Sequence, residues 1–162
     1  FFEKSADQRR GFRWLKRVVG AAAVVAGVTF VVTTPTRGIG FRAGTLDAVR
    51  ASLDRGRPVI VDFTASWCLA CHELERNTFS HPDVIRAAQG FDAYRVDLTK
   101  FDSPEAQAWK KEYGIAGLPT VLFLAADGRE VEEARVVGFV PPPEFRERLV
   151  LASRRGQRAE RE

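Results

Sequence analysis

The segment WCLACH, residues 67–72, contains the only two cysteines of the 162-residue chain, Cys68 and Cys71. The Cys-x-x-Cys-His pattern is the attachment signature of a c-type haem, whereas Cys-x-x-Cys preceded by Trp is typical of a thiol–disulfide redox site. The same pair could also bind zinc or form a structural disulfide. The choice among these four chemistries decides both the fold and the function.

Haem and zinc are disfavoured by the shortage of further ligands. The second axial ligand of a c-type haem is commonly Met, and the chain contains no Met. Its two histidines are His72 and His81, and the gap between them is too long for a common zinc site. We therefore expect neither a metal nor another cofactor.

A disulfide between these cysteines is better suited to exchange than to stabilisation. Closing a loop of four residues removes only about 2 kcal/mol of unfolded-chain entropy. Cys68 lies at the start of a predicted helix, where free N–H groups favour a thiolate, and Cys71 lies one turn later on the same face. The spacing therefore favours a redox pair.

The pattern around the motif predicts an α/β domain with a partly parallel sheet. Two strands are separated by helices, so helical crossovers must join them. Apolar, β-branched runs indicate the strands, and Ser, Thr, Pro and Gly mark the ends of the helices. The predicted elements are a helix 45–55, a strand 58–65, helices from 68 to 77 and from Ser80, a strand 91–99, a helix from Pro104 to Gly114, a hairpin with strands 120–125 and 131–138, and a last helix from Pro142.

Two further residues fit a redox site. Asp62 lies inside the apolar strand 58–65, where a buried carboxylate is costly, so we expect it to be protonated or to transfer protons. A solvated strand Asp is the alternative. Pro119 begins a strand in GLPT and is a candidate for a cis peptide bond, although an ordinary trans proline is also compatible.

The segments VDFTASWCLAC (61–71), TFS (78–80), GLPT (117–120) and the Asp127-Gly128 turn resemble a thioredoxin-like fold, a central mixed sheet flanked by helices. The resemblance is closest to the C-terminal domain of the DsbD family of thiol:disulfide interchange proteins, and it extends over about residues 56–149. Within this family, a Glu two turns after the first Cys corresponds to Glu75. A Lys commonly follows the second Cys, whereas this chain has His72.

The resemblance implies roles for individual residues. Cys68 would attack and Cys71 would resolve the mixed disulfide. Asp62 and Glu75 would be the acids beside the pair, and we expect both carboxylates to raise the pKa of the Cys68 thiol. The residues implied to contact the partner are Trp67, Leu118 and Pro119.

An apolar run precedes the domain. Residues 18–34 carry no charge and would span about 26 Å as a helix, so a transmembrane helix is predicted at 14–34. The basic residues before it predict a cytoplasmic N-terminus. A cleaved export signal is the alternative, because Arg9-Arg10 resembles a twin-arginine sequence. The predicted division is a basic cytoplasmic flank 1–13, the transmembrane helix 14–34, a linker 35–44, the thioredoxin-like domain 45–153 and a basic tail 154–162.

The resemblance also implies partners and a location. The electron donor would be a membrane-embedded redox domain, and the acceptor would be an extracytoplasmic disulfide-containing protein. Contact with membrane lipid is expected, with the catalytic domain on the periplasmic side of the inner membrane. The alternatives are a stand-alone membrane-anchored reductase, for example in cytochrome c maturation, and a non-enzymatic binding module with a closed disulfide. No nucleic-acid partner is expected, because the basic residues behind the net charge of +4 are concentrated at the two ends of the chain.

Overall fold

The computed structural model describes Val19 and residues 38–159. The chain divides into two units, Phe1–Thr36 and Arg37–Glu162, and only the second is described in detail. The predicted transmembrane helix at 14–34 lies outside the described residues except for Val19. No helix within the described part of the chain is both long and apolar enough for a membrane span.

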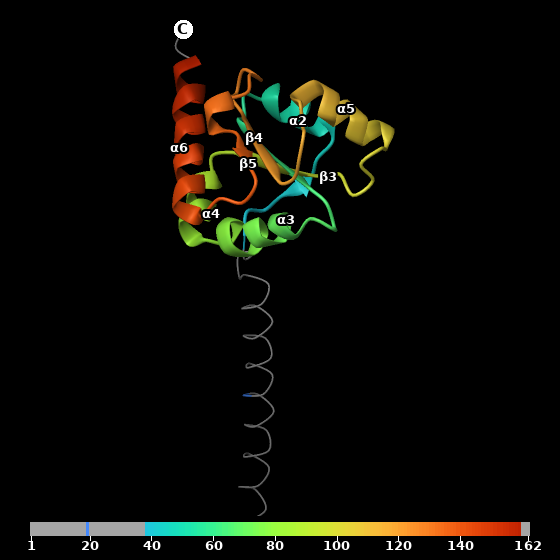
Figure 1. Cartoon of the computed structure of the whole chain (residues 1–162). Helices are drawn as coiled ribbons and strands as arrows, with labels where there is room; N and C mark the ends of the chain where they lie inside the picture. The colour runs from blue at the N-terminus through green and yellow to red at the C-terminus, as the bar shows by residue number, and fades with distance from the viewer. Residues whose placement is uncertain (1–18, 20–37, 160–162) are drawn as a thin grey trace, which may run out of the picture. The chain divides into compact units, whose positions relative to one another are not determined.

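The described residues of the second unit form one mixed sheet with helices on both sides (Figure 1). The strand order is β1-β3-β2-β4-β5, in which β1, β3 and β2 are parallel, and β4 and β5 continue the sheet in antiparallel pairs. This arrangement confirms the predicted α/β class with a central mixed sheet flanked by helices. The elements are β1 (Arg42–Ala43), α2 (Leu46–Leu53), β2 (Val59–Thr64), α3 (Leu69–Leu74), the π-helical turn η1 (Glu75–Phe79), α4 (Pro82–Ala88), β3 (Asp92–Asp97), α5 (Pro104–Tyr113), β4 (Thr120–Leu124), the 3-10 turn η2 (Glu132–Ala134), β5 (Val136–Val137) and α6 (Pro142–Ala159).

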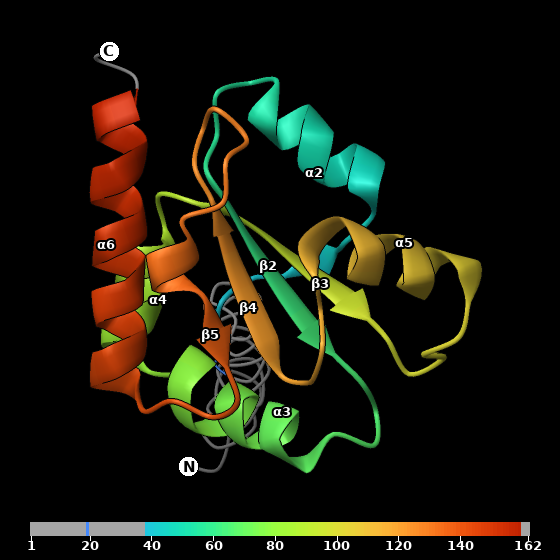
Figure 2. The same ribbon diagram turned by 45° about the horizontal axis from the view of Figure 1, so that its top comes forward.

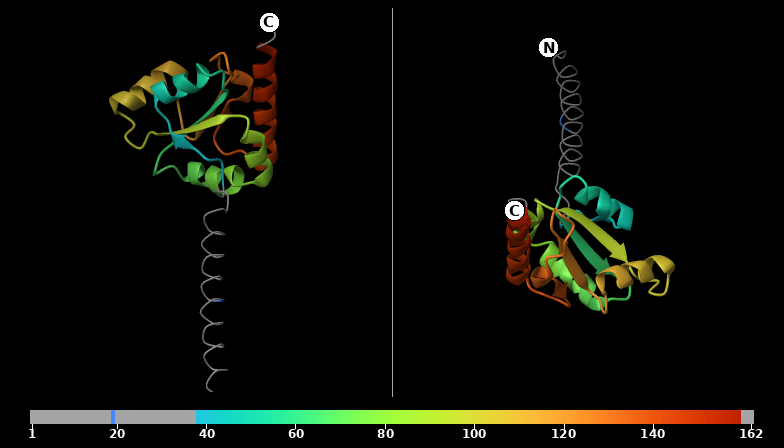
Figure 3. Two further views of the ribbon diagram at one scale, coloured as in Figure 1. Left: turned by 180° about the vertical axis from the view of Figure 1, so that it is seen from behind. Right: turned by 90° about the horizontal axis from the view of Figure 1, so that it is seen from above.

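The sheet separates two hydrophobic clusters, because alternate side chains of a strand point to opposite faces. On one face Ile60 of β2 packs with residues of α4 and α6, and also with Leu74 of α3. On the other face Val61 packs against α2 and α5. Figure 2 shows α6 on the opposite side of the sheet from α2 and α5, and Figure 3 shows α4 beside α6. Asp62 alternates with Val61, so it shares the face of Ile60, which α3 covers.

The predicted helix ends are confirmed where a side chain caps the backbone. Thr45 accepts a hydrogen bond from the backbone N–H of Ala48 at 3.1 Å and begins α2. Ser103 accepts from Ala106 at 3.2 Å and begins α5, with Pro104 in the first turn. Gly114 ends α5 with φ of 61°, a left-handed conformation that glycine adopts without steric cost.

The second strand of the predicted hairpin, 131–138, is interrupted. Only Val136 and Val137 form the strand β5, because the 3-10 turn η2 precedes them. This turn leaves Glu132 and Glu133 exposed and places Ala134 in the core. In a regular strand, successive side chains alternate between core and solvent, so one of the adjacent residues Glu132 and Glu133 would have been placed in the core.

Other boundaries also differ from the prediction. The predicted helix 68–77 changes to π-helical geometry at Glu75, and the helix predicted from Ser80 begins at Pro82 with His81 as its cap. Strand β1 lies inside the predicted linker 35–44, and α6 continues to Ala159, past the predicted domain end at 153.

Candidate active site

The two cysteines form a disulfide at the junction of β2 and α3. The S–S distance is 2.04 Å and the Cα atoms are 5.3 Å apart. Cys68 is the N-cap of α3, and its Sγ accepts a hydrogen bond from the backbone N–H of Cys71 at 3.2 Å. Both cysteines are buried in this oxidised form. The predicted position of the pair, at the end of a central strand and the start of a helix, is therefore confirmed.

The loop before Cys68 is held to the loop after β3. The backbone N–H of Ser66 donates to Oγ1 of Thr99 at 2.9 Å, and Nε1 of Trp67 donates to the Thr99 carbonyl oxygen at 3.4 Å. Thr99 is itself fixed by a hydrogen bond from its backbone N–H to Oδ1 of Asp97 at 2.8 Å. Despite this anchor, Trp67 remains 62% exposed. The indole is thus oriented but available for contact with another molecule.

Leu118 lies beside the disulfide, and Pro119 follows it in the chain. Leu118 packs against the cluster formed by Ala65 and the two cysteines. The Leu118–Pro119 peptide bond is cis, as the sequence analysis anticipated. The carbonyl oxygen of Pro119 accepts from the backbone N–H of Gly138 at 2.8 Å, which ties this loop to the end of β5.

The two predicted acids are joined by an arginine that the sequence analysis did not identify. Nε of Arg95 donates to Oδ2 of Asp62 at 2.8 Å, and its Nη1 donates to Oε1 of Glu75 at 2.9 Å. Asp62 and Arg95 are direct neighbours in the register of β2 and β3. Glu75 reaches the same guanidinium from the first residue of η1. The structure therefore brings the predicted acids together around one cation.

Burial controls the ionisation of Asp62. Desolvation raises the pKa of its carboxyl from an ordinary value of 3.8 to about 6, Arg95 opposes this increase, and the charge of Glu75 adds to it. The side chain is only 3% exposed. The carboxyl can therefore gain or lose a proton near neutral pH, as a proton-transfer group must. That both acids raise the pKa of the Cys68 thiol stays a prediction. Because Arg95 offsets one of the two negative charges, the expected increase in this pKa is smaller.

His72, the ligand in the haem interpretation, faces the protein backbone. Its Nε2 lies 3.1 Å from the carbonyl oxygen of Ser66, within the same loop that carries Trp67. In this position the ring supports the loop before Cys68.

Arg95 could have been noticed from its position in the sequence. It is a basic residue within the predicted strand 91–99, where Ala93, Tyr94 and Val96 are buried. A charged side chain at such a position needs a partner, because an isolated buried charge is costly. The identity of that partner depends on the register between β2 and β3, which the sequence does not reveal.

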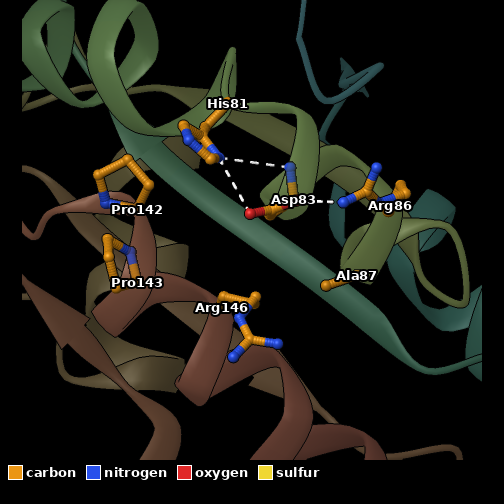
Figure 4. A pocket seen from close by; sticks show the side chains of 7 residues that line it. All are labelled: His81, Asp83, Arg86, Ala87, Pro142, Pro143 and Arg146. Carbon is orange, nitrogen blue, oxygen red and sulfur yellow. Dashed lines mark hydrogen bonds and ion pairs between the residues drawn. The ribbon is translucent and has the colours of Figure 1, made fainter.

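A pocket of about 670 Å³ lies elsewhere, between α4 and the start of α6 (Figure 4). His81 and Arg86 both contact Asp83 in its wall. None of the residues that line it belongs to the predicted redox site. The lining residues are His81, Asp83, Arg86, Ala87, Pro142, Pro143 and Arg146.

Comparison with known proteins places this geometry among thiol–disulfide proteins. Thiol:disulfide interchange protein DsbD of Klebsiella pneumoniae is 46% identical over 91 residues, which cover 56% of this chain and 15% of that protein. DsbD of Escherichia coli K12 is 33% identical over 156 residues, which cover 89% of this chain and 27% of that protein. The chain thus spans about a quarter or less of the length of these relatives.

Structural and family comparisons agree with these relatives. The oxidised C-terminal domain of Neisseria meningitidis DsbD is 33% identical, has a TM-score of 0.56, and matches over 67% of this chain and 95% of that domain. Together with the Cys68–Cys71 pair, these similarities support a thiol–disulfide oxidoreductase. The family model described as "Thioredoxin-like domain" matches residues 47–153. The chain therefore belongs to the family of thioredoxin-like domains.

Proposed function

We propose that the Cys68–Cys71 pair receives electrons from a membrane-embedded redox domain and reduces disulfides of extracytoplasmic proteins. The observation that carries the proposal is the disulfide at the N-terminus of α3, with the cis Leu118–Pro119 bond in the adjacent loop. The similarity to thiol:disulfide interchange proteins supports exchange through this pair. The proposed direction of electron flow follows from the resemblance described in the sequence analysis. The apolar segment predicted at 14–34 supports a location on the periplasmic side of the inner membrane.

The reaction begins with the reduced pair. The Cys68 thiolate attacks one sulfur of the partner disulfide, so that a Cys68–partner S–S bond forms and the other partner sulfur leaves as a thiolate and takes up a proton. The hydrogen bond from the backbone N–H of Cys71 to Sγ of Cys68 stabilises negative charge on the attacking sulfur.

The second step releases the partner. The Cys71 thiol loses its proton, for which Asp62 is the proposed acceptor, and the resulting thiolate attacks Sγ of Cys68. The Cys68–Cys71 disulfide forms, and the second partner sulfur leaves as a thiolate. Two electrons pass from the domain to the partner, and the membrane-embedded donor restores the dithiol.

The proposed activity is tested by insulin reduction. We expect the chain, supplied with dithiothreitol, to accelerate the precipitation of reduced insulin over dithiothreitol alone. The measurement is turbidity at 650 nm, and the control is the chain with both cysteines changed to serine. A wild-type rate equal to that of the control would contradict exchange and would favour the closed-disulfide binding module.

Trp67 is proposed to contact protein partners, because its indole is anchored through Thr99 and is largely exposed. Truncation of an exposed aromatic contact commonly costs about 1–2 kcal/mol of binding free energy. Trp67→Ala is therefore expected to reduce kcat/KM for insulin by roughly 5- to 30-fold. The rate with a small aromatic disulfide should change little. An equal loss with both substrates would mean that Trp67 acts on the cysteines rather than on the partner.

A further inference from the structure

Arg95 is held in place by contacts on several sides of its guanidinium. Two of its nitrogens donate to Asp62 and Glu75 at 2.8 and 2.9 Å. The guanidinium carbon lies 4.7 Å from the centre of the Phe41 ring, which stacks against it. Phe41 packs in turn on Phe79, with ring centres 5.1 Å apart. The arginine is therefore fixed between the sheet, η1 and the segment before β1.

The two carboxylates that Arg95 contacts differ in their access to water. The Asp62 side chain is 3% exposed, whereas that of Glu75 is 52% exposed. Water can therefore stabilise the charge of Glu75, but the charge of Asp62 depends on the protein. Among the charged side chains of the described residues, Arg95 is the cation in direct contact with Asp62.

Within residues 38–159, the other elements packed around Asp62 add no second cation in contact with it. On β4 its register neighbour is the apolar Val121. From the helix side, Glu75 is the titratable group that acts on Asp62, and Nε2 of His72 lies 3.1 Å from the Ser66 carbonyl oxygen. The charge that Asp62 experiences is thus set mainly by Arg95 and Glu75, with opposite signs.

We propose that Arg95 is a positioning residue of the redox site, which holds Asp62 and Glu75 together and sets the pH range over which Asp62 ionises. The inference rests on the proposed role of Asp62 as proton acceptor for Cys71. The pKa of Asp62 agrees with this geometry, because burial raises it and the contact with Arg95 lowers it. Without the guanidinium, the proton would stay on Asp62 to higher pH, and the carboxyl could not accept a second proton from Cys71.

The experiment measures the ionisation of Asp62 directly in the oxidised chain, where the cysteines do not titrate. The side-chain carboxyl carbon of Asp62 is followed by ¹³C NMR between pH 4 and 9. Arg95→Gln is expected to move the midpoint upward by about one pH unit or more, a tenfold change in the acid dissociation constant. Glu75→Gln is expected to move it downward, because it removes a negative charge and leaves Arg95 to Asp62 alone.

Two further variants serve as controls. Arg76→Gln removes an arginine whose Nε donates to the His72 carbonyl oxygen one turn earlier in the chain, and it should leave the midpoint of Asp62 unchanged. Arg95→Lys keeps the charge but lacks the planar fork that reaches both acids, so a smaller upward shift is expected. If Arg95→Gln does not fold, the midpoint of Asp62 in Arg95→Lys tests the proposal instead. An unchanged midpoint in a folded Arg95→Gln or Arg95→Lys chain would overturn the proposal.

A second measurement separates this inference from the proposed function. The pH dependence of insulin reduction is compared between the wild type and Arg95→Gln. In Arg95→Gln, the part of the pH–rate profile that depends on Asp62 should shift to higher pH together with the carboxyl midpoint. Such a shift would support both the control of Asp62 by Arg95 and proton transfer by Asp62. A shifted midpoint with an unchanged activity profile would support control of Asp62 by Arg95 and contradict the proton-transfer step.

Discussion

The Cys71→Ser chain is expected to stay covalently bound to a disulfide-containing partner, whereas the Cys68→Ser chain is expected to remain free. Cys68 is the N-cap of α3, and its Sγ already accepts a backbone N–H, so it is the better thiolate. Without Cys71 the mixed disulfide has no intramolecular route to release. Non-reducing electrophoresis and mass spectrometry after incubation of each reduced variant with insulin should show at least tenfold more adduct for Cys71→Ser.

The control for this trapping experiment is the chain with both cysteines replaced, which should form no adduct. Addition of dithiothreitol should release the trapped insulin from Cys71→Ser, because the bond is a disulfide. Similar amounts of adduct with both single variants would contradict the assigned order of attack. The order would be reversed if Cys68→Ser formed the greater amount.

Asp62→Asn is expected to stabilise the oxidised domain at neutral pH by up to about 3 kcal/mol. The pKa of Asp62 is 3.8 without burial and about 6 in the folded protein, so the folded state binds the proton more tightly. Stability of the wild type therefore falls as pH rises from about 4 to 6, and the loss is complete above that range. Asn cannot ionise and avoids this loss, while Arg95 keeps Glu75 as a partner.

Urea unfolding of the wild type and Asp62→Asn at several pH values between about 2.5 and 8 would measure this difference. The difference between the two proteins should shrink as the pH falls through this range and should vanish below about pH 3, where Asp62 is protonated in both the folded and the unfolded state. Asp102→Asn is the control, because the same change at an exposed aspartate should alter stability little at any pH. A constant difference at all pH values would mean that the substitution acts through packing rather than ionisation.

The sequence was sufficient for the parts of the site that depend on local patterns. The Cys68–Cys71 spacing, the apolar strand around Asp62 and the GLPT segment each indicate one part of the redox site. Their assembly follows from the order of strands and helices, since the end of a central strand is adjacent to the start of the next helix. The helix caps Thr45 and Ser103 could likewise be predicted from the sequence, because capping is a short-range interaction.

The features that the sequence did not reveal depend on contacts between distant segments. The pairing of Asp62 with Arg95 requires the register of β2 and β3, in which a shift of one residue would turn Arg95 to the other face. The change to π-helical geometry at Glu75 has no comparable sequence signal. Strand β1 consists of two residues, too few for a periodic pattern, and it forms because Gly44 allows close approach to the backbone of Arg95.

The unequal exposure of the two ion pairs of Arg95 has a consequence for ionic strength. Dissolved salt screens charges that face water and has much less effect on buried pairs. Added salt should therefore loosen Glu75 from the guanidinium while Asp62 stays bound to it. Because the charge of Glu75 adds to the proton affinity of Asp62, screening of Glu75 should lower that affinity slightly, while the buried contact between Asp62 and Arg95 is retained.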